Sequence, residues 1–187
     1  MVRIASRRGS RRIMSSQFVV SFVALVAVLL LMLAEQQRSL AHERALRRQG
    51  AVEPSDDVYP TMRWAYPAAF VVMAVEGAFD GPSPGMTTVI GAALLVASKT
   101  LKFWAIRSLG PRWTFRVLVP PGAPLVTSGP YAFLRHPNYV AVIGELMGMA
   151  ITVGARVTGP VVTILVELLL VHRIRVENSA LRRPPRA

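Results

Sequence analysis

The sequence predicts an all-α, polytopic membrane protein with about five transmembrane helices. Hydrophobic residues make up 52% of the 187-residue chain, more than a soluble domain of this length needs. They occur in long continuous runs rather than in the alternating pattern of half-buried strands. Most arginines lie next to these runs, as is usual at membrane boundaries. Cysteine is absent, which excludes disulfides and thiolate metal sites.

The first span is predicted at Phe18–Ala34, which carries no charge and is almost long enough to cross a bilayer. An arginine-rich tail, residues 1–17, precedes a single membrane-embedded domain at residues 18–187. Basic residues followed by an apolar run resemble an uncleaved signal anchor. Translation starting at Met14 is the alternative, and it would remove the five arginines of the tail.

The second and third spans are predicted at Ala65–Phe79 and Met86–Ile106. The segment before them, Val52–Pro67, is polar and contains three prolines, which is typical of a loop. The third run ends with Lys99 and Lys102. We expect both lysines to extend along the helix surface toward the membrane interface.

The last two spans are predicted within Tyr139–Val171, which is apolar for 33 residues apart from a break at residues 154–160. This length fits two short helices joined by a tight turn better than one helix, and so predicts a helical hairpin. The preceding connector, Gly110–Pro130, is rich in proline and glycine between short apolar runs and is expected to be ordered. The C-terminal cluster then continues the last helix past the membrane.

Charge distribution predicts the sidedness. With five spans, 16 of the 22 lysines and arginines fall on the face that carries the two long loops and the C-terminus. This face is expected to be cytoplasmic in a bacterial plasma membrane, although the basic tail then lies on the other side. The net charge of +12 is explained in the same way, so nucleic acid is not an expected partner. No metal site is predicted from three scattered histidines.

The first candidate site is the stretch GPYAFLRHPNY, Gly129–Tyr139, directly before the hairpin. Pro137 suits the first helical position, which places His136 at the N-cap. Free N–H groups and the positive end of the helix dipole favour an anionic ligand there, while the aromatic side chains offer flat surfaces for a base. An interfacial belt of aromatic and basic residues is an equal alternative.

The second candidate site is VHRIRVENSAL, Val171–Leu181, at the end of the hairpin. Arg173 and Glu177 are four residues apart, so they share one helix face. Because both clusters flank one hairpin, an antiparallel pair of helices would bring them together. Glu145, seven positions after Asn138, lies on the face that points toward this site. It is a hypothetical general base, with an interhelical hydrogen-bonding role as the alternative.

These residues resemble a known family. The order LVTSGPYAFLRHPNY, an apolar hairpin and RIRVENSAL is similar to the isoprenylcysteine carboxyl methyltransferase family of integral membrane enzymes, and most of all to its bacterial alkylpyrone and alkylresorcinol O-methyltransferases. The resemblance implies S-adenosylmethionine as cofactor and Arg173 as the residue facing substrate. It also implies a set of cofactor-binding residues, namely Leu125, Val126, Tyr131, His136, Pro137, Asn138, Tyr139 and Glu177.

The sequence departs from the family at Ala123, Ala141 and Asn178. Asn178 need not harm cofactor binding, because Glu177 is kept, while the changes at Ala123 and Ala141, together with the short C-terminal tail, argue against prenylcysteine as the acceptor. The expected reaction is methyl transfer from S-adenosylmethionine to an oxygen of a lipophilic acceptor, either a carboxylate or a phenol or hydroxypyrone. A cation such as Arg173, or a base such as Glu145, would help a hydroxyl acceptor to react. The expected partners are membrane lipids and an acceptor that enters from the bilayer. An NADPH-dependent membrane reductase with a similar RHPNY stretch and a non-enzymatic membrane scaffold are the alternatives.

Overall fold

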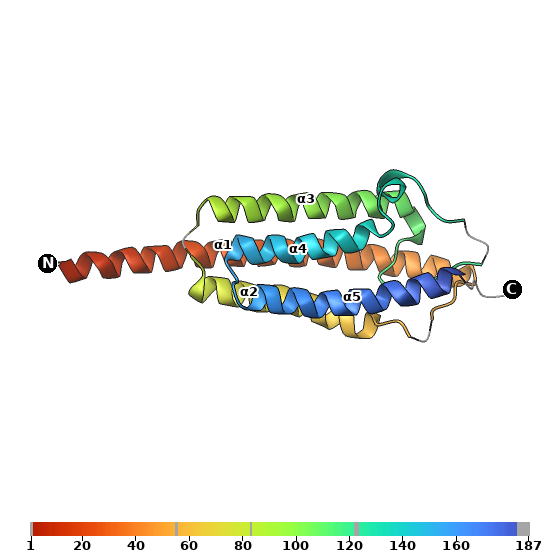
Figure 1. Ribbon diagram of the computed structural model, residues 1–187, viewed down its shortest axis with the longest axis horizontal. Helices are drawn as coiled ribbons and strands as arrows, with labels where there is room; N and C mark the ends of the chain where they lie inside the picture. Colours follow the sequence, from red (N-terminus) through yellow and green to blue (C-terminus); the bar gives the residue numbers. More distant parts are fainter. Residues whose placement is uncertain (1, 55, 83, 122–123, 183–187) are drawn as a thin grey trace.

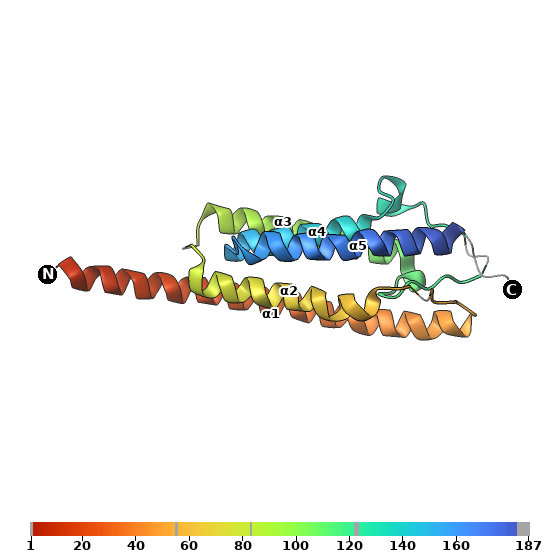
Figure 2. The same cartoon turned by 60° about the horizontal axis from the view of Figure 1, so that its bottom comes forward.

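The protein is a bundle of five α-helices that run alternately in opposite directions (Figures 1 and 2). The computed structural model describes residues 2–54, 56–82, 84–121 and 124–182, with side chains from residue 16 to residue 180. The helices are α1 (Val2–Arg48), α2 (Tyr59–Asp80), α3 (Met86–Leu109), α4 (Pro137–Val153) and α5 (Thr158–Arg182). The described residues contain no strand beyond an isolated bridge between Val52 and Val119, so the all-α class is confirmed.

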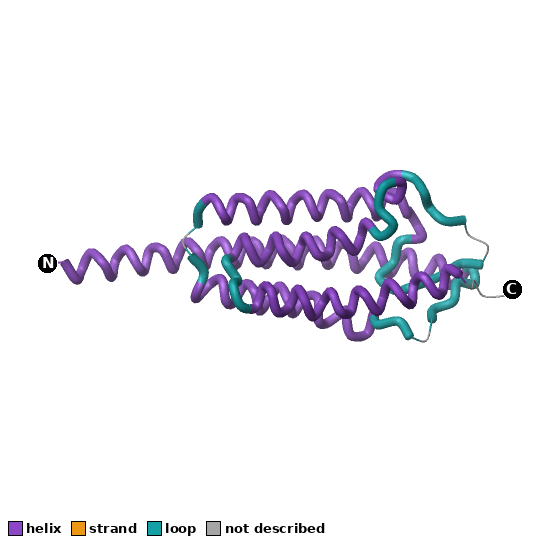
Figure 3. The backbone as a smooth tube through the Cα atoms, viewed as in Figure 1, coloured by secondary structure: helices purple, strands orange, loops and turns teal. Residues whose placement is uncertain are grey.

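The loops divide between the two ends of the bundle (Figure 3). The long connector before α4, the loop at residues 49–58 and the end of α5 share one end, and the short loops share the other with the N-terminus. Two helices are long and apolar enough to cross a membrane, Ser16–Arg48 and Met86–Arg112, and Pro137–Val153 is a shorter apolar helix. Insertion of all five helices and a cytoplasmic connector stay predictions.

α1 extends beyond the predicted first span at both ends. Its backbone is helical from Val2, while the side chains before Ser16 lie outside the described residues. The predicted first span ended at Ala34, but the helix continues to Arg48. Its polar side chains have partners there: Ser39 Oγ donates to Glu43 Oε1 at 2.8 Å and accepts from the Phe115 N–H at 2.8 Å.

α2 also begins earlier than predicted, at Tyr59, and includes Pro67 within the helix. Pro60 lies in its first turn, where a proline needs no backbone N–H partner. The loop predicted at residues 52–67 is therefore confined to residues 49–58.

α3 and α4 pack closely through small residues. Gly144 and Gly148 of α4 are four residues apart, and a Cβ added at Gly148 would lie 2.6 Å from the backbone nitrogen of Leu95. Small residues at this spacing let helix backbones approach within a membrane. α4 ends at Gly154, whose φ of 75° is the left-handed conformation common at helix C-termini.

The predicted hairpin is confirmed, with its turn at residues 154–157. Gly159 and Pro160, which were expected in the turn, lie in the first turn of α5. That helix start is held by Glu76 of α2, whose carboxylate accepts from the N–H groups of Val157 and Thr158 at 2.9 and 2.7 Å.

The expectation for the α3 lysines is wrong. Lys99 and Lys102 face the inside of the bundle, with side chains 13% and 1% exposed. Both form ion pairs with Glu35 of α1 and Glu145 of α4. We call these four residues the buried ion cluster. The lysines face inward because two carboxylates from neighbouring helices neutralise them there, which sequence composition alone does not show.

Candidate functional site

A cavity of about 900 Å³ lies at the connector end of the bundle. Residues from all five helices and from the connector line it. Its helical walls are largely apolar, with Leu29, Met32, Leu33, Met62, Val142 and Leu170 among their side chains. A volume of this size lies within the range of small-molecule sites.

The sequence-predicted site residues gather around this cavity. It is lined by Leu125, Val126, Tyr131, His136, Pro137, Asn138, Tyr139, Arg173 and Glu177. Residues separated by as many as 52 positions, from Leu125 to Glu177, therefore face one space. Of the three departures from the family pattern, Asn178 also lines the cavity and Ala141 is buried in α4. Ala123 lies outside the described residues.

The start of α4 contacts the end of α5, as the hairpin predicts. His136 is the N-cap residue of α4, but its side chain makes no capping hydrogen bond. Instead its Nδ1 lies 3.8 Å from Glu177 Oε2, and the Tyr139 hydroxyl donates to the same oxygen at 2.6 Å. Arg135 donates to Asn178 Oδ1 at 3.3 Å. The two clusters therefore form one site.

Several polar groups at this end of the cavity are available to a ligand. His136 Nε2 and Asn138 Oδ1 are buried and have no hydrogen-bond partner among the described residues. Burial of the Tyr131 phenol, together with the Glu177 carboxylate, raises the pKa of Tyr131 to about 12, so this hydroxyl remains a neutral donor at physiological pH. Since buried polar groups are rarely left unpaired, the site fits a ligand with several hydrogen-bonding groups, as S-adenosylmethionine has.

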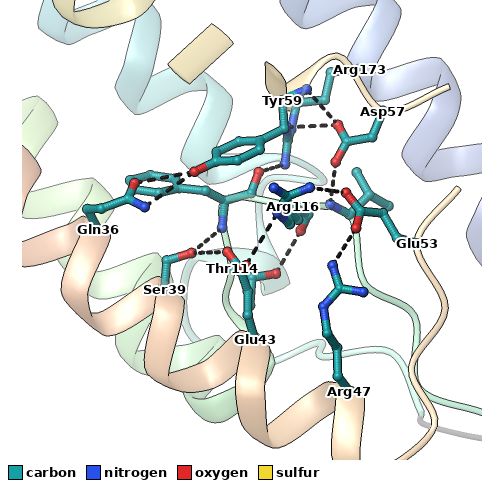
Figure 4. Close-up of polar contacts among 12 residues, drawn as sticks. Gln36, Ser39, Glu43, Arg47, Glu53, Asp57, Tyr59, Thr114, Arg116 and Arg173 are labelled. Atoms are coloured by element: carbon teal, nitrogen blue, oxygen red, sulfur yellow. Dashed lines mark hydrogen bonds and ion pairs between the residues drawn. The ribbon is translucent and has the colours of Figure 1, made fainter. Parts of the chain in front are cut away.

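Arg173 is held firmly by protein groups. Its Nε donates to Tyr139 Oη at 3.1 Å, its Nη1 donates to Asp57 Oδ1 at 3.2 Å, and its Nη2 donates to the Phe115 carbonyl. Asp57 also accepts from the N–H of Val117 at 2.9 Å (Figure 4). Asp57 therefore joins the loop at residues 49–58, the connector and α5 in one network.

Sequence reasoning missed Asp57 as a site residue. It lies 116 positions before its partner Arg173, in a loop that was interpreted only as polar. The available signal was a pair of aspartates directly before a proline-containing helix start, which is too common a pattern to identify a site.

The connector is fastened to α1 by a second charged network (Figure 4). Arg116 lies 2.5 Å from Glu53 and 3.4 Å from Glu43, and Arg47 lies 2.5 Å from Glu53. Partial burial alone would raise the pKa of Glu53, but the hydrogen bonds and charges of Arg116 and Arg47 outweigh it and lower that pKa. The connector therefore forms a fixed wall of the cavity.

Glu145 lies outside the cavity, in contrast to the expectation from its position on α4. Its side chain is fully buried and has three partners: the Tyr66 hydroxyl at 2.7 Å, Lys99 Nζ at 2.8 Å and Lys102 Nζ at 3.3 Å. Tyr66 and Lys102 do line the cavity, so Glu145 is placed behind them. Its role as a general base stays a prediction.

Comparisons with known proteins identify the family of the chain. Residues 90–183 match the model of the isoprenylcysteine carboxyl methyltransferase (ICMT) family. The uncharacterized protein YpbQ of Bacillus subtilis (strain 168) is 32% identical over 162 residues, which cover 86% of this chain and 96% of the relative. An uncharacterized protein of Haemophilus influenzae is 29% identical over 144 residues, covering 76% and 84%. No solved structure matches significantly. The chain belongs to the isoprenylcysteine carboxyl methyltransferase family of membrane methyltransferases.

Proposed function

We propose that this protein transfers a methyl group from S-adenosylmethionine to an oxygen atom of a lipophilic acceptor. The observation that carries the proposal is one cavity lined by two chemically different groups of residues. Polar residues at the start of α4, near the end of α5 and in the connector, namely His136, Asn138, Glu177 and Tyr131, form what we call the polar end, and apolar side chains further inside the helices, such as Val142 and Leu170, form the apolar end. A polar cofactor and an apolar acceptor can therefore meet in the same space.

The cofactor fits the polar end. When bound, it supplies an electrophilic methyl group on a sulfonium. The positive end of the helix dipole at the start of α4 favours its carboxylate. His136 Nε2 and Asn138 Oδ1, the two buried groups without partners, would hydrogen-bond to it, and Glu177 would accept from a ribose hydroxyl or the amino group. Leu125 and Val126 provide apolar walls.

The acceptor fits the apolar end and reaches it from the side. Leu33 of α1 and Trp64 of α2 line the cavity and are 59% and 69% exposed, and we infer that the cavity reaches the surface of the bundle between these two helices. In a bilayer that surface faces lipid, so an acceptor with an alkyl chain could enter without crossing water. The protein then aligns the acceptor oxygen with the methyl group and excludes water, which is the main requirement for an in-line displacement.

We place the connector end of the bundle on the cytoplasmic face of a bacterial plasma membrane. The helix ends, the connector and the C-terminal residues on that side of the sequence-predicted topology contain most of the arginines, as the positive-inside rule requires. The cavity lies at the same end, so a water-soluble cofactor would bind from the cytoplasm.

Thermal unfolding of the detergent-purified protein tests this function. S-adenosylhomocysteine, NADPH and NADP⁺ are compared on the wild type, His136→Ala and Glu177→Gln. A ligand at 100 times its dissociation constant adds about 2.7 kcal/mol of stability, and we expect this only for S-adenosylhomocysteine and only in the wild type. Stabilisation by NADPH instead would favour a membrane reductase. No response to any of the three would favour a scaffold.

A further inference from the structure

The buried ion cluster contains two lysines with the same partners. Lys99 Nζ lies 3.2 Å from Glu35 and 2.8 Å from Glu145. Lys102 Nζ lies 2.8 Å from Glu35 and 3.3 Å from Glu145. The four charges sum to zero, which is what burial of ionised groups requires. Their ion pairs alone therefore do not distinguish the two lysines.

They differ in their relation to the cavity. Lys102 lines it, whereas Lys99, Glu35 and Glu145 do not. An ammonium group has three N–H donors, and carboxylates are the only acceptors near Lys102 Nζ among the described residues, one from each of two glutamates. At least one N–H therefore remains for a ligand. The same nitrogen lies 5.4 Å from the ring centroid of Tyr66, another cavity residue.

The position of Lys102 suits the acceptor rather than the cofactor. Its partner Glu145 is seven residues after Asn138 on α4, which is roughly 10 Å along the helix axis. Arg173, the other buried cation at the cavity, is neutralised by Asp57 and donates from three of its nitrogens to protein groups. Of these two buried cations, Lys102 is thus the one with a free donor, and it lies away from the cofactor motif.

We propose that Lys102 is a catalytic residue that binds the acceptor oxygen as an oxyanion. This inference rests on the proposed function and narrows the acceptor to an ionised oxygen, either the phenolate or enolate of an acidic hydroxyl or a carboxylate. In the transfer, the oxyanion forms an O–C bond and the C–S bond breaks, with its electron pair staying on sulfur. The oxygen carries no proton to remove, so no general base is required.

The other charged groups around Lys102 do not cancel its effect on the acceptor. Glu35 of α1, Tyr66 of α2, Lys99 of α3 and Glu145 of α4 all face it, but neither carboxylate lines the cavity. The ammonium group is therefore the charge of the buried ion cluster that lies closest to a bound acceptor. A cation at 4–6 Å lowers the pKa of an acid by about 1–3 units.

Lys99→Gln is a matched control for Lys102→Gln, because each removes one lysine from the same two glutamates. The experiment titrates a 5-alkylresorcinol, whose phenolate absorbs at longer wavelength than the phenol, on each purified protein with S-adenosylhomocysteine present. We expect its bound pKa to be lower than in detergent alone, by about one unit or more, in the wild type and Lys99→Gln but not in Lys102→Gln. A purely structural role predicts equal changes in both variants and would overturn the inference.

A second acceptor separates the two sources of an oxyanion. If the resorcinol pKa does not move in the wild type, a long-chain fatty acid is bound instead. Weaker binding of its carboxylate to Lys102→Gln, but not to Lys99→Gln, assigns the site to carboxylates. Unchanged binding in both variants contradicts the inference.

Folding and cofactor binding are followed separately by the thermal shift with S-adenosylhomocysteine. If the wild type shows no shift, the proposed function fails. If S-adenosylhomocysteine stabilises the wild type but acceptor binding does not depend on Lys102, only the inference about Lys102 is refuted. Should Lys102→Gln not fold, the double variant Lys102→Gln/Glu145→Gln keeps the cluster neutral and must show the same loss.

Discussion

The hydroxyl of Tyr139 donates a 2.6 Å hydrogen bond to the carboxylate of Glu177, 38 residues later in the chain. This bond joins the two polar clusters that flank the hairpin. Because Arg173 Nε also donates to the Tyr139 oxygen at 3.1 Å, one phenol holds both functional side chains of α5 in place.

Tyr139→Phe should therefore weaken both stability and cofactor binding. The change leaves the buried Arg173 Nε without its acceptor, which costs about 1–3 kcal/mol. Chemical unfolding would measure the loss, and titration with S-adenosylhomocysteine would measure the affinity. Tyr131→Phe is the control: its hydroxyl has no protein hydrogen bond among those found in the described residues, so only the cofactor affinity should fall. Equal stability losses in both variants would contradict this account.

Asp57→Asn should lower activity more than cofactor affinity. Asp57 neutralises Arg173 and accepts from two backbone N–H groups, those of Val117 and Tyr59. An amide in its place leaves the buried guanidinium without a counter-charge, and we expect a decrease in kcat on the order of tenfold or more. The exposed neighbour Asp56 gives the comparison, and Asp56→Asn should retain activity within about twofold. Full activity of Asp57→Asn would exclude a positioning role.

Lowering the pH should destabilise the protein by weakening the ion pairs that hold the connector. The pKa of Glu53 is lowered in the folded protein. The ionised carboxylate therefore contributes its full stabilisation of the fold above its unfolded pKa of 4.5, and this stabilisation is lost as the pH falls through the pKa of the folded protein. Thermal unfolding between pH 6 and pH 3 would show stability decreasing in that direction, because the unfolded chain binds the proton more tightly. The stability of Glu53→Gln should depend less on pH over this range. An equal pH dependence in the variant and the wild type would show that other carboxylates cause the loss of stability in acid.

Gly148→Ala should separate α3 from α4. The added Cβ would lie 2.6 Å from the Leu95 backbone nitrogen, which a packed helix pair can relieve only by moving apart. We expect a loss of about 1–3 kcal/mol, as is usual for overpacking, measured by unfolding in detergent. Met147→Ala, at a side chain 47% exposed on the neighbouring position, should change stability less. A larger loss of stability in Met147→Ala than in Gly148→Ala would mean that these helices do not pack as described.

The sequence was sufficient to predict the hairpin and the contact between the two polar clusters that flank it. Gly154 interrupts an apolar run that is too long for one helix, and an antiparallel pair must then bring His136 and Glu177 together. The positions of Lys99 and Lys102 could not be predicted, because an apolar helix does not show which of its faces meets a neighbour. Glu35 and Glu145 decide that orientation from two other helices.

The role of Asp57 could not be predicted from the sequence for a different reason. Its contact with Arg173 depends on how a loop between the first two helices folds over the end of the fifth. That arrangement is a property of the whole bundle, and no local periodicity in the sequence encodes it. The same reason applies to the second half of α1. Its polar residues form a helix on which the connector packs, and that contact cannot be read from the local sequence.

α4 carries Asn138 and Glu145 on one face, two turns apart. Asn138 lines the cavity, whereas Glu145 lies behind Lys102, which also lines it. In the proposed reaction this rigid helix would fix the distance between the cofactor and the acceptor oxygen, while α1 and α2 line the space for the rest of the acceptor. We therefore expect relatives that take acceptors of another size to differ in those two helices and to keep the spacing along α4.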